Sequence, residues 1–249
     1  MKRIVMILLA AAVPLFGFSG QAMAYFTDGD LIRVVYQKGG ANEVATDLGA
    51  FAPTAAYSGT GISFTTNLFP TAGAVGGAFS TAALADLQVA YFVRDVATTH
   101  AWTSGPQAGQ VSGNRQWTSA FSGGVQLLQS KYATFGTAQA TLLQSDTQAY
   151  VKLMDNGGIN FGKFGGFIPL ANGEQNLAAL GTAGFVDSYL YYYATPNSPL
   201  AGSQVATLRT FADGHTEVVG ASPVPIPAPV MLLGSGLMAL VGIRRKQAV

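Results

Sequence analysis

The C-terminal end of the chain, residues 223–249, has three parts in a fixed order. A stretch with proline at every second position is followed by an uncharged apolar run over residues 230–243 and then by a basic cluster. A helix over this run would be ~21 Å long, against ~30 Å for the hydrocarbon core of a bilayer. The helix is longer if it starts at Pro227, and the long basic side chains can extend from its end to the membrane surface. Its length is then marginal for a membrane span. Because basic residues stay on the cytoplasmic side, everything before Pro223 is predicted to lie outside.

Hydropathy alone is equally typical of a buried core helix or a plain C-terminal anchor. The motifs within the tail are more specific, and they are Val224-Pro225-Ile226-Pro227-Ala228, Leu233-Gly234-Ser235-Gly236-Leu237 and Gly242-Ile243-Arg244-Arg245-Lys246. Together they resemble the PEP-CTERM family of sorting signals, and they are most similar to its VPLPA-type branch. The positions that carry the resemblance are Val224, Pro225, Pro227, Ala228, Gly234, Ser235, Gly236, Arg244, Arg245 and Lys246.

The resemblance implies that the protein is a substrate of an exosortase, a membrane protease-like transpeptidase. Such an enzyme recognises the tail, removes it, and releases or attaches the protein at the cell exterior, often among exopolysaccharide. Ile226 stands where the commonest form of the motif has Glu between two prolines. This departure leaves the processing enzyme and the cleavage position open.

The N-terminus predicts a secretory signal peptide. Lys2 and Arg3 precede an apolar run over residues 4–18, and Ala22-Met23-Ala24 is the small-x-small pattern that signal peptidase requires. Cleavage is therefore expected between Ala24 and Tyr25, although an uncleaved membrane anchor is the alternative. The chain then divides into a signal peptide (residues 1–24), an exported domain (residues 25–222) and a sorting tail (residues 223–249).

Charge and cysteine content fit export. Of 13 basic and 12 acidic residues, five basic ones lie in the two ends, which leaves 8 basic against 12 acidic residues, a net charge of −4 for the domain. Such a domain has no basic surface for nucleic acid. The chain has no cysteine, so no disulfide can stabilise the domain.

The domain pattern predicts a mainly β fold, an antiparallel sheet or β-sandwich with short helical insertions, flanked by the signal helix and the short transmembrane helix. Expected hairpins join residues 30–37 to 43–48, and residues 204–212 to 215–219 through Asp213-Gly214. Residues 59–67, 87–96 and 185–194 are further strand candidates. No alternation of strands and helices indicates a parallel sheet.

Two regions of the domain lack the strand pattern. Residues 100–113 are expected to be a loop with Trp102 as a packing anchor. Residues 122–154 are expected to be helical, with a short helix after Ser145 and an apolar stripe formed by Val125, Leu127, Leu128, Tyr132 and Phe135.

No catalytic constellation or cofactor motif is recognisable. His100 and His215 are far apart in sequence, and His215 is expected on the exposed side of a hairpin. Asp28 and Asp30 offer two carboxylates to Ca²⁺, but the spacing of a calcium loop is missing, so a turn and strand start is favoured. The tyrosine run at residues 189–193 is a candidate stacking platform for sugars, with one face expected in the core.

Three functions stay open at this point. The favoured one is a non-enzymatic exported protein, sorted by an exosortase-type protease to the cell surface or matrix, with a structural, adhesive or polysaccharide-associated role. The second is a surface hydrolase with the same tail. The third is a periplasmic protein that remains anchored in the inner membrane by an uncleaved tail.

Overall fold

The computed structural model describes residues 25–59, 62–64, 79, 82–105, 122–155, 173–194 and 202–220. The predicted signal peptide and sorting tail lie outside these residues. Within the described part of the chain, no helix is long and apolar enough to span a bilayer.

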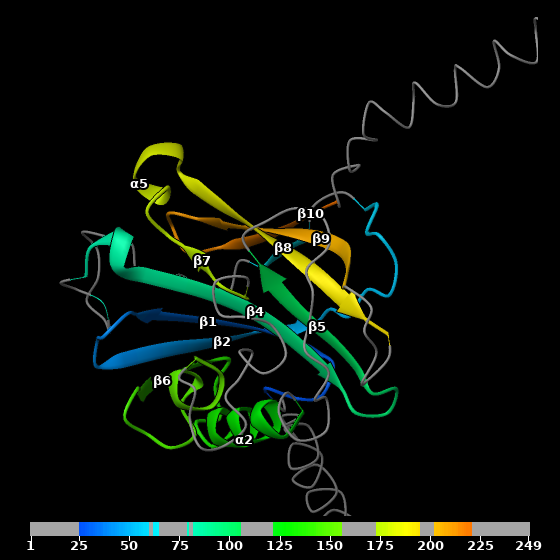
Figure 1. Cartoon of the computed structure of the whole chain (residues 1–249), viewed down its shortest axis with the longest axis horizontal. Helices are drawn as coiled ribbons and strands as arrows, with labels where there is room; N and C mark the ends of the chain where they lie inside the picture. Colours follow the sequence, from blue (N-terminus) through cyan, green and yellow to red (C-terminus); the bar gives the residue numbers. More distant parts are fainter. Residues whose placement is uncertain are drawn as a thin grey trace, which may run out of the picture.

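Ten antiparallel strands form one curled sheet, a half-barrel with few helices (Figure 1). The strand order is β3-β10-β9-β8-β5-β4-β1-β2-β6, and β7 pairs with β4 beside this path. The strands are β1 (Asp30–Gln37), β2 (Asn42–Ala50), β3 (Ile62–Phe64), β4 (Leu87–Asp95), β5 (His100–Gly105), β6 (Gln139–Leu143), β7 (Gln175–Asn176), β8 (Phe185–Tyr193), β9 (Ser203–Phe211) and β10 (Thr216–Gly220). The helical segments are the 3-10 turn η2 (Leu84–Asp86), α2 (Ser122–Ala133), the π-helical turn η4 (Val151–Asp155) and α5 (Leu180–Ala183). The expected antiparallel sheet is confirmed, and its alternative, a sandwich of two sheets, is not what the described strands form.

Both expected hairpins are present. β1 pairs with β2 and β9 pairs with β10, each antiparallel. Their turns contain Gly39 and Gly214, with φ of +73° and +91°, a left-handed conformation that glycine adopts without a steric penalty. The strand candidates over residues 87–96 and 185–194 are confirmed as β4 and β8, and the one over residues 59–67 is confirmed in its short central part, β3.

Some expectations were wrong. Residues 100–105 form the interior strand β5, between β4 and β8, where a loop was expected. The helical region begins correctly with α2, but strand β6 interrupts it, and the turn that follows Ser145 leads into the π-helical segment η4. Phe135 lies beyond the end of α2 and is 44% exposed, so it is not part of the buried stripe.

The concave side of the sheet encloses an inner core. β1 and β4 contribute Leu31, Val35, Val89 and Val93, and they face Leu190, Leu208 and Val218 from β8, β9 and β10. Trp102 belongs to this core and is 1% exposed, as expected of a packing anchor. The inner core therefore joins strands that are several positions apart in the sheet.

Arg33 lies within this inner core and is 1% exposed. Its Nη1 donates hydrogen bonds to the Gly214 carbonyl at 2.6 Å and to Thr216 Oγ1 at 3.0 Å. Tyr91 Oη lies 2.5 Å from Thr210 Oγ1 and 3.0 Å from Thr216 Oγ1. Because β1 and β10 are not neighbours in the sheet, these contacts fix how far it curls.

The convex side carries an outer core beneath α2 and η4 (Figure 1). Ile32, Val34 and Phe92 from the sheet pack with side chains of the two helical segments, namely Val125, Leu128, Tyr132, Tyr150 and Leu153. β1 and β4 are therefore buried on both faces.

Replacing Thr216 by Val should test the cross-sheet contact. The substitution keeps the shape but removes the hydroxyl that accepts from Arg33 and contacts Tyr91, so we expect a loss of about 1–3 kcal/mol in the free energy of unfolding. Urea denaturation of the purified protein measures this. Thr207→Val is the matched control, because the Thr207 hydroxyl is buried without a hydrogen-bond partner among the described residues. Equal effects of the two substitutions would contradict the role given to Thr216.

Candidate functional site

The predicted site residues fall in two groups. All the sorting-motif positions, and Ala22 and Ala24 of the signal peptidase site, lie outside the described residues. Tyr25, the expected first residue after cleavage, is the first residue that the structure describes. Any site within the described domain is therefore separate from these motifs.

The two histidines lie apart and have different surroundings. The hydroxyl of Tyr192 is 3.1 Å from His100 Nδ1, and the His100 ring packs edge-on against Trp102 and Tyr192. His215 Nδ1 is 2.5 Å from Asp213 Oδ1, and the ring stacks on Phe211. Neither histidine contacts a serine within the described residues, so no nucleophile–base pair is formed there.

Asp28 and Asp30 serve the turn before β1. Asp28 accepts from Arg94 Nε at 2.9 Å and from the Val96 N–H at 2.7 Å. Asp30 Oδ2 accepts from the Thr27 N–H and the Thr27 hydroxyl, both at 2.6 Å. The described residues contain no group of three or more potential metal ligands. Turn formation accounts for both carboxylates.

The tyrosine run is divided between the two cores. Tyr191 and Tyr193 are buried in the outer core, whereas Leu190 and Tyr192 face the inner core. The predicted alternation is confirmed, but both faces of the run are packed. This burial argues against an exposed stacking platform.

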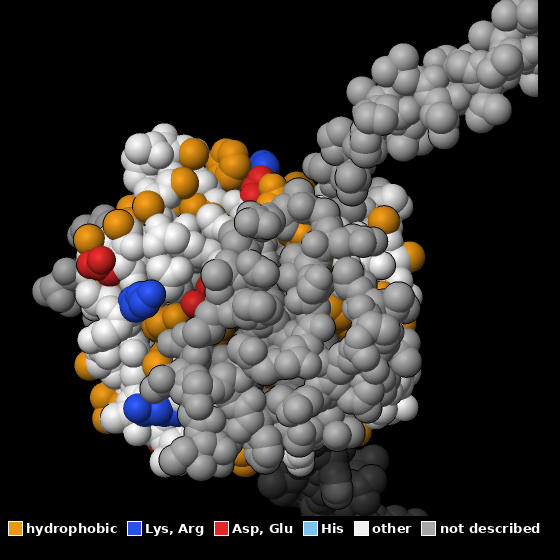
Figure 2. Space-filling view, viewed as in Figure 1, with side chains coloured by type: hydrophobic (Ala, Val, Ile, Leu, Met, Phe, Trp, Pro, Cys, Tyr) orange, Lys and Arg blue, Asp and Glu red, His pale blue; other side chains and the backbone are white. Residues whose placement is uncertain are grey.

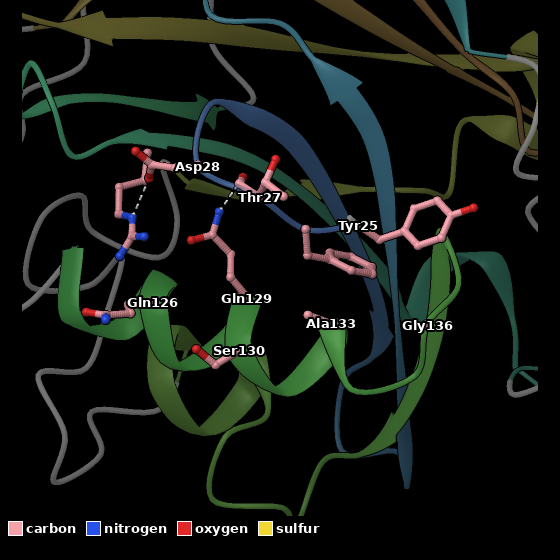
Figure 3. Close-up of a pocket in the computed structure, with 10 residues that line it drawn as sticks. Tyr25, Thr27, Asp28, Gln126, Gln129, Ser130, Ala133 and Gly136 are labelled. Carbon is pink, nitrogen blue, oxygen red and sulfur yellow. Dashed lines mark hydrogen bonds and ion pairs between the residues drawn. The ribbon is translucent and has the colours of Figure 1, made fainter. Parts of the chain in front are cut away.

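A pocket of about 420 Å³ lies between the chain segment that precedes β1 and helix α2 (Figure 3). Three separate parts of the chain form it: the N-terminal segment, the end of β4 and the polar side of α2. Its lining residues are Tyr25, Phe26, Thr27, Asp28, Arg94, Gln126, Gln129, Ser130, Ala133 and Gly136. Figure 3 shows Asp28 and Gln126 at one end, Gln129 in the middle, and Tyr25 and Gly136 at the other end.

The N-terminal wall is fixed by its backbone. Phe26 has a φ of +59°, a conformation that is uncommon outside glycine, and its N–H donates to Asp47 Oδ2 at 2.5 Å. The Phe26 ring is 3% exposed and lies 5.3 Å from the ring of Tyr132. Gly29, at a φ of +87°, then turns the chain, and its N–H donates to the Arg94 carbonyl at 2.8 Å. These contacts place Asp28 beside Arg94.

Helix α2 presents two faces with helical spacing. Val125, Leu128 and Tyr132 form the buried stripe that the sequence predicted. The positions beside that stripe form the pocket wall, and they are Gln126, Gln129, Ser130 and Ala133. Packing of the first face on the sheet therefore orients the second toward the N-terminal segment.

Gln129 is the most buried polar side chain of the pocket on α2. It is 5% exposed, and its Nε2 donates to the Thr27 carbonyl at 2.8 Å. Its Oε1 is buried and has no hydrogen-bond partner among the described residues. A buried acceptor without a donor is costly, so this oxygen would gain a hydrogen bond from any ligand hydroxyl or water that reached it.

A buried carboxylate anchors α2 to the sheet. Glu43 on β2 is 0% exposed; it accepts a very short hydrogen bond from the Tyr132 hydroxyl and further bonds from the N–H groups of Tyr150 and Val151, at 2.6 and 3.0 Å. Burial raises the pKa of Glu43 to about 7, and the three donated bonds oppose this shift without cancelling it. The pocket wall thus depends on a carboxyl group that titrates near neutrality.

Comparisons with protein families, characterised proteins and solved structures gave no match to the chain. The pocket is therefore interpreted from its own geometry. Sequence reasoning missed it because its walls come from distant segments. Of its lining residues, the sequence patterns point only to Tyr25 and Asp28, and for other reasons.

Glu43 should make stability depend on pH. Its folded pKa is about 7 and its ordinary value 4.5, so the folded state binds the extra proton between these values. The free energy of unfolding should therefore be highest below pH 4.5, as far as this group is concerned, and fall by up to about 3 kcal/mol as the pH rises through 7.

Urea denaturation at several pH values checks this expectation. In Glu43→Gln the fall should disappear, because the side chain no longer titrates, whereas the matched surface variant Glu217→Gln should keep it. A pH profile that is unchanged in Glu43→Gln would rule out the assignment.

Proposed function

We propose that the protein is exported through its N-terminal signal peptide and sorted by an exosortase-type membrane protease to the cell surface or extracellular matrix. Its role there is non-enzymatic: structural, adhesive or associated with exopolysaccharide. The observation that carries the proposal is the order of the parts of the tail. Pro225 and Pro227 precede an apolar run that is short for a helix that spans the bilayer, and the basic cluster Arg244, Arg245 and Lys246 follows it.

The extent of the folded domain supports the proposal. The first described strand, β1, begins at Asp30, after the expected signal peptidase site, and the last, β10, ends at Gly220, before the proline-rich stem. All ten strands lie between the two predicted signals. Removal of both ends would therefore leave the whole described sheet intact.

The chemistry of the domain also suits an exterior location. The fold contains no cysteine and rests on two apolar cores, so it does not depend on a redox environment. On the described part of the surface in Figure 2, charged side chains are few and scattered. A surface of this kind suits contact with neutral hydrated polymers better than contact with nucleic acid.

Scrambling residues 223–249 at constant composition should separate export from sorting. Export across the inner membrane should persist, because the signal peptide is unchanged, but final placement at the surface should fail. Protease accessibility on intact cells and spheroplasts, together with fractionation, measures the two steps. A chain with residues 223–249 unchanged is the control. Normal surface placement of the scrambled chain would refute the sorting function.

The mass of the mature protein tests processing directly. We expect material recovered from the cell exterior to begin at Tyr25 and to lack the Arg244-Arg245-Lys246 cluster, with its end near the proline motif. Intact-mass spectrometry measures both ends at once. A surface protein that retains the basic cluster would contradict removal of the tail and favour a permanent anchor.

A further inference from the structure

The sorting proposal makes no use of the pocket between α2 and the N-terminal segment, and the walls of this pocket are chemically selective. Among the described residues that line it, the charged side chains are Asp28 and Arg94, which are paired with each other at 2.9 Å. An anionic ligand would have to compete with Asp28 for the guanidinium, and a cation would find one carboxylate that is already paired. The walls therefore favour a neutral ligand.

The neutral groups of the pocket suit a hydroxylated molecule. Gln129 points from α2 toward Thr27 across the pocket, and Gln126 and Ser130 line the pocket from the same helix (Figure 3). Carboxamides and hydroxyls both donate and accept, as sugar hydroxyls do. A purely apolar ligand would leave these groups without partners, at a cost for each that is desolvated.

The buried Gln129 oxygen favours a ligand that carries a hydrogen-bond donor. The amide cannot rotate freely, because Nε2 is bonded to the Thr27 carbonyl, so Oε1 keeps its position. This oxygen is buried and has no partner among the described residues. A hydroxyl that donates to it would satisfy the acceptor, and a ligand without a donor would not.

The opposite end of the pocket is apolar. Tyr25, Phe26, Ala133 and Gly136 line it, and the Tyr25 side chain is half-buried. A sugar ring presents hydroxyls at its edge and C–H groups on its faces, and aromatic rings such as Tyr combine an apolar body with a polar tip. The pocket likewise combines a polar end with an apolar end. Its volume of about 420 Å³ is within the ~300–1,000 Å³ of small-ligand sites.

We propose that this pocket binds a neutral saccharide unit of a polysaccharide, with Gln129 Oε1 accepting from a ring hydroxyl and Gln126 bonding at the polar end. That the unit belongs to matrix polysaccharide rests on the proposed surface location. The site itself is a property of the folded domain and can be tested without reference to sorting.

Binding is tested on the protein purified from cells in the form in which it is recovered. The probes are neutral tetrasaccharides of glucose, mannose, galactose and N-acetylglucosamine, a tetragalacturonate as the anionic arm, and an uncharged Gly/Ser/Ala peptide. Saturation-transfer NMR detects binding, and calorimetry gives the Kd. We expect saturable binding of at least one neutral tetrasaccharide and none of tetragalacturonate or peptide.

Gln129→Met and Gln126→Met should each weaken that binding about 3- to 10-fold, as expected for one lost hydrogen bond. Gln126 is exposed, so its variant keeps the test valid if Gln129→Met fails to fold. Gln148→Met, outside the pocket, is the matched control and should bind like the wild type. Thermal unfolding of each variant checks the fold.

Several outcomes would overturn the proposal. They are no saturable binding of any neutral tetrasaccharide, stronger binding of tetragalacturonate or peptide, and saccharide binding unchanged in both Gln126→Met and Gln129→Met. If the protein reaches the surface but binds no saccharide, the pocket assignment fails and the sorting function stands. If purified protein binds saccharide but is not sorted by its tail, the reverse holds.

Discussion

The curl of the sheet depends on the burial of a single cation. The guanidinium of Arg33 has been removed from water, and this desolvation lowers its pKa, although hydrogen bonding to Tyr91 opposes the shift. A buried charge is tolerated only when its donors find acceptors. β10 and the turn before it supply them through Gly214 and Thr216, and these residues reach Arg33 only because the sheet bends back over β1. An open, flatter sheet would leave the charge in an apolar core without those partners.

Bending gives the sheet a concave and a convex environment. Arg33 lies on the concave side, and Glu43, another fully buried titratable side chain, lies on the convex side. Arg33 and Glu43 belong to neighbouring paired strands, but Arg33 is opposite Thr46 and Glu43 is opposite Tyr36, and the two charged side chains lie on different faces. They do not neutralise each other, so each is satisfied locally. Arg33 is bonded across the concave side, and Glu43 is bonded to α2 and to the start of η4 on the convex side. Arg33 therefore fixes the curvature of the sheet, and Glu43 fixes the position of the helix α2 that covers it.

The sequence predicts those parts of the fold whose pattern is local. The hairpin of β1 and β2, the Asp213-Gly214 turn and the aromatic run of β8 each have a pattern that is complete within a few residues, and each was assigned correctly. The prediction missed β5 because Ala101, Thr103 and Ser104 are small or polar. The neighbouring strands of the sheet nevertheless bury all three residues. The prediction missed β6 because its five residues follow a true helix and only one glycine, Gly136, separates the two. The pocket was not predictable, since no local pattern links Phe26, Arg94 and Gln129.

The position of the pocket beside Tyr25 links its formation to the proposed export route. Cleavage after Ala24 needs an accessible chain on both sides of the cut, yet Phe26 is buried against Tyr132, and its N–H is bonded to Asp47. The predicted cleavage site, between Ala24 and Tyr25, is one residue from this anchored group. Cleavage should therefore precede the docking of Phe26, and the N-terminal wall of the pocket can close only afterwards. If the protein follows the proposed export route, this order of events would complete the site outside the inner membrane, where the proposed polysaccharide ligand would be encountered.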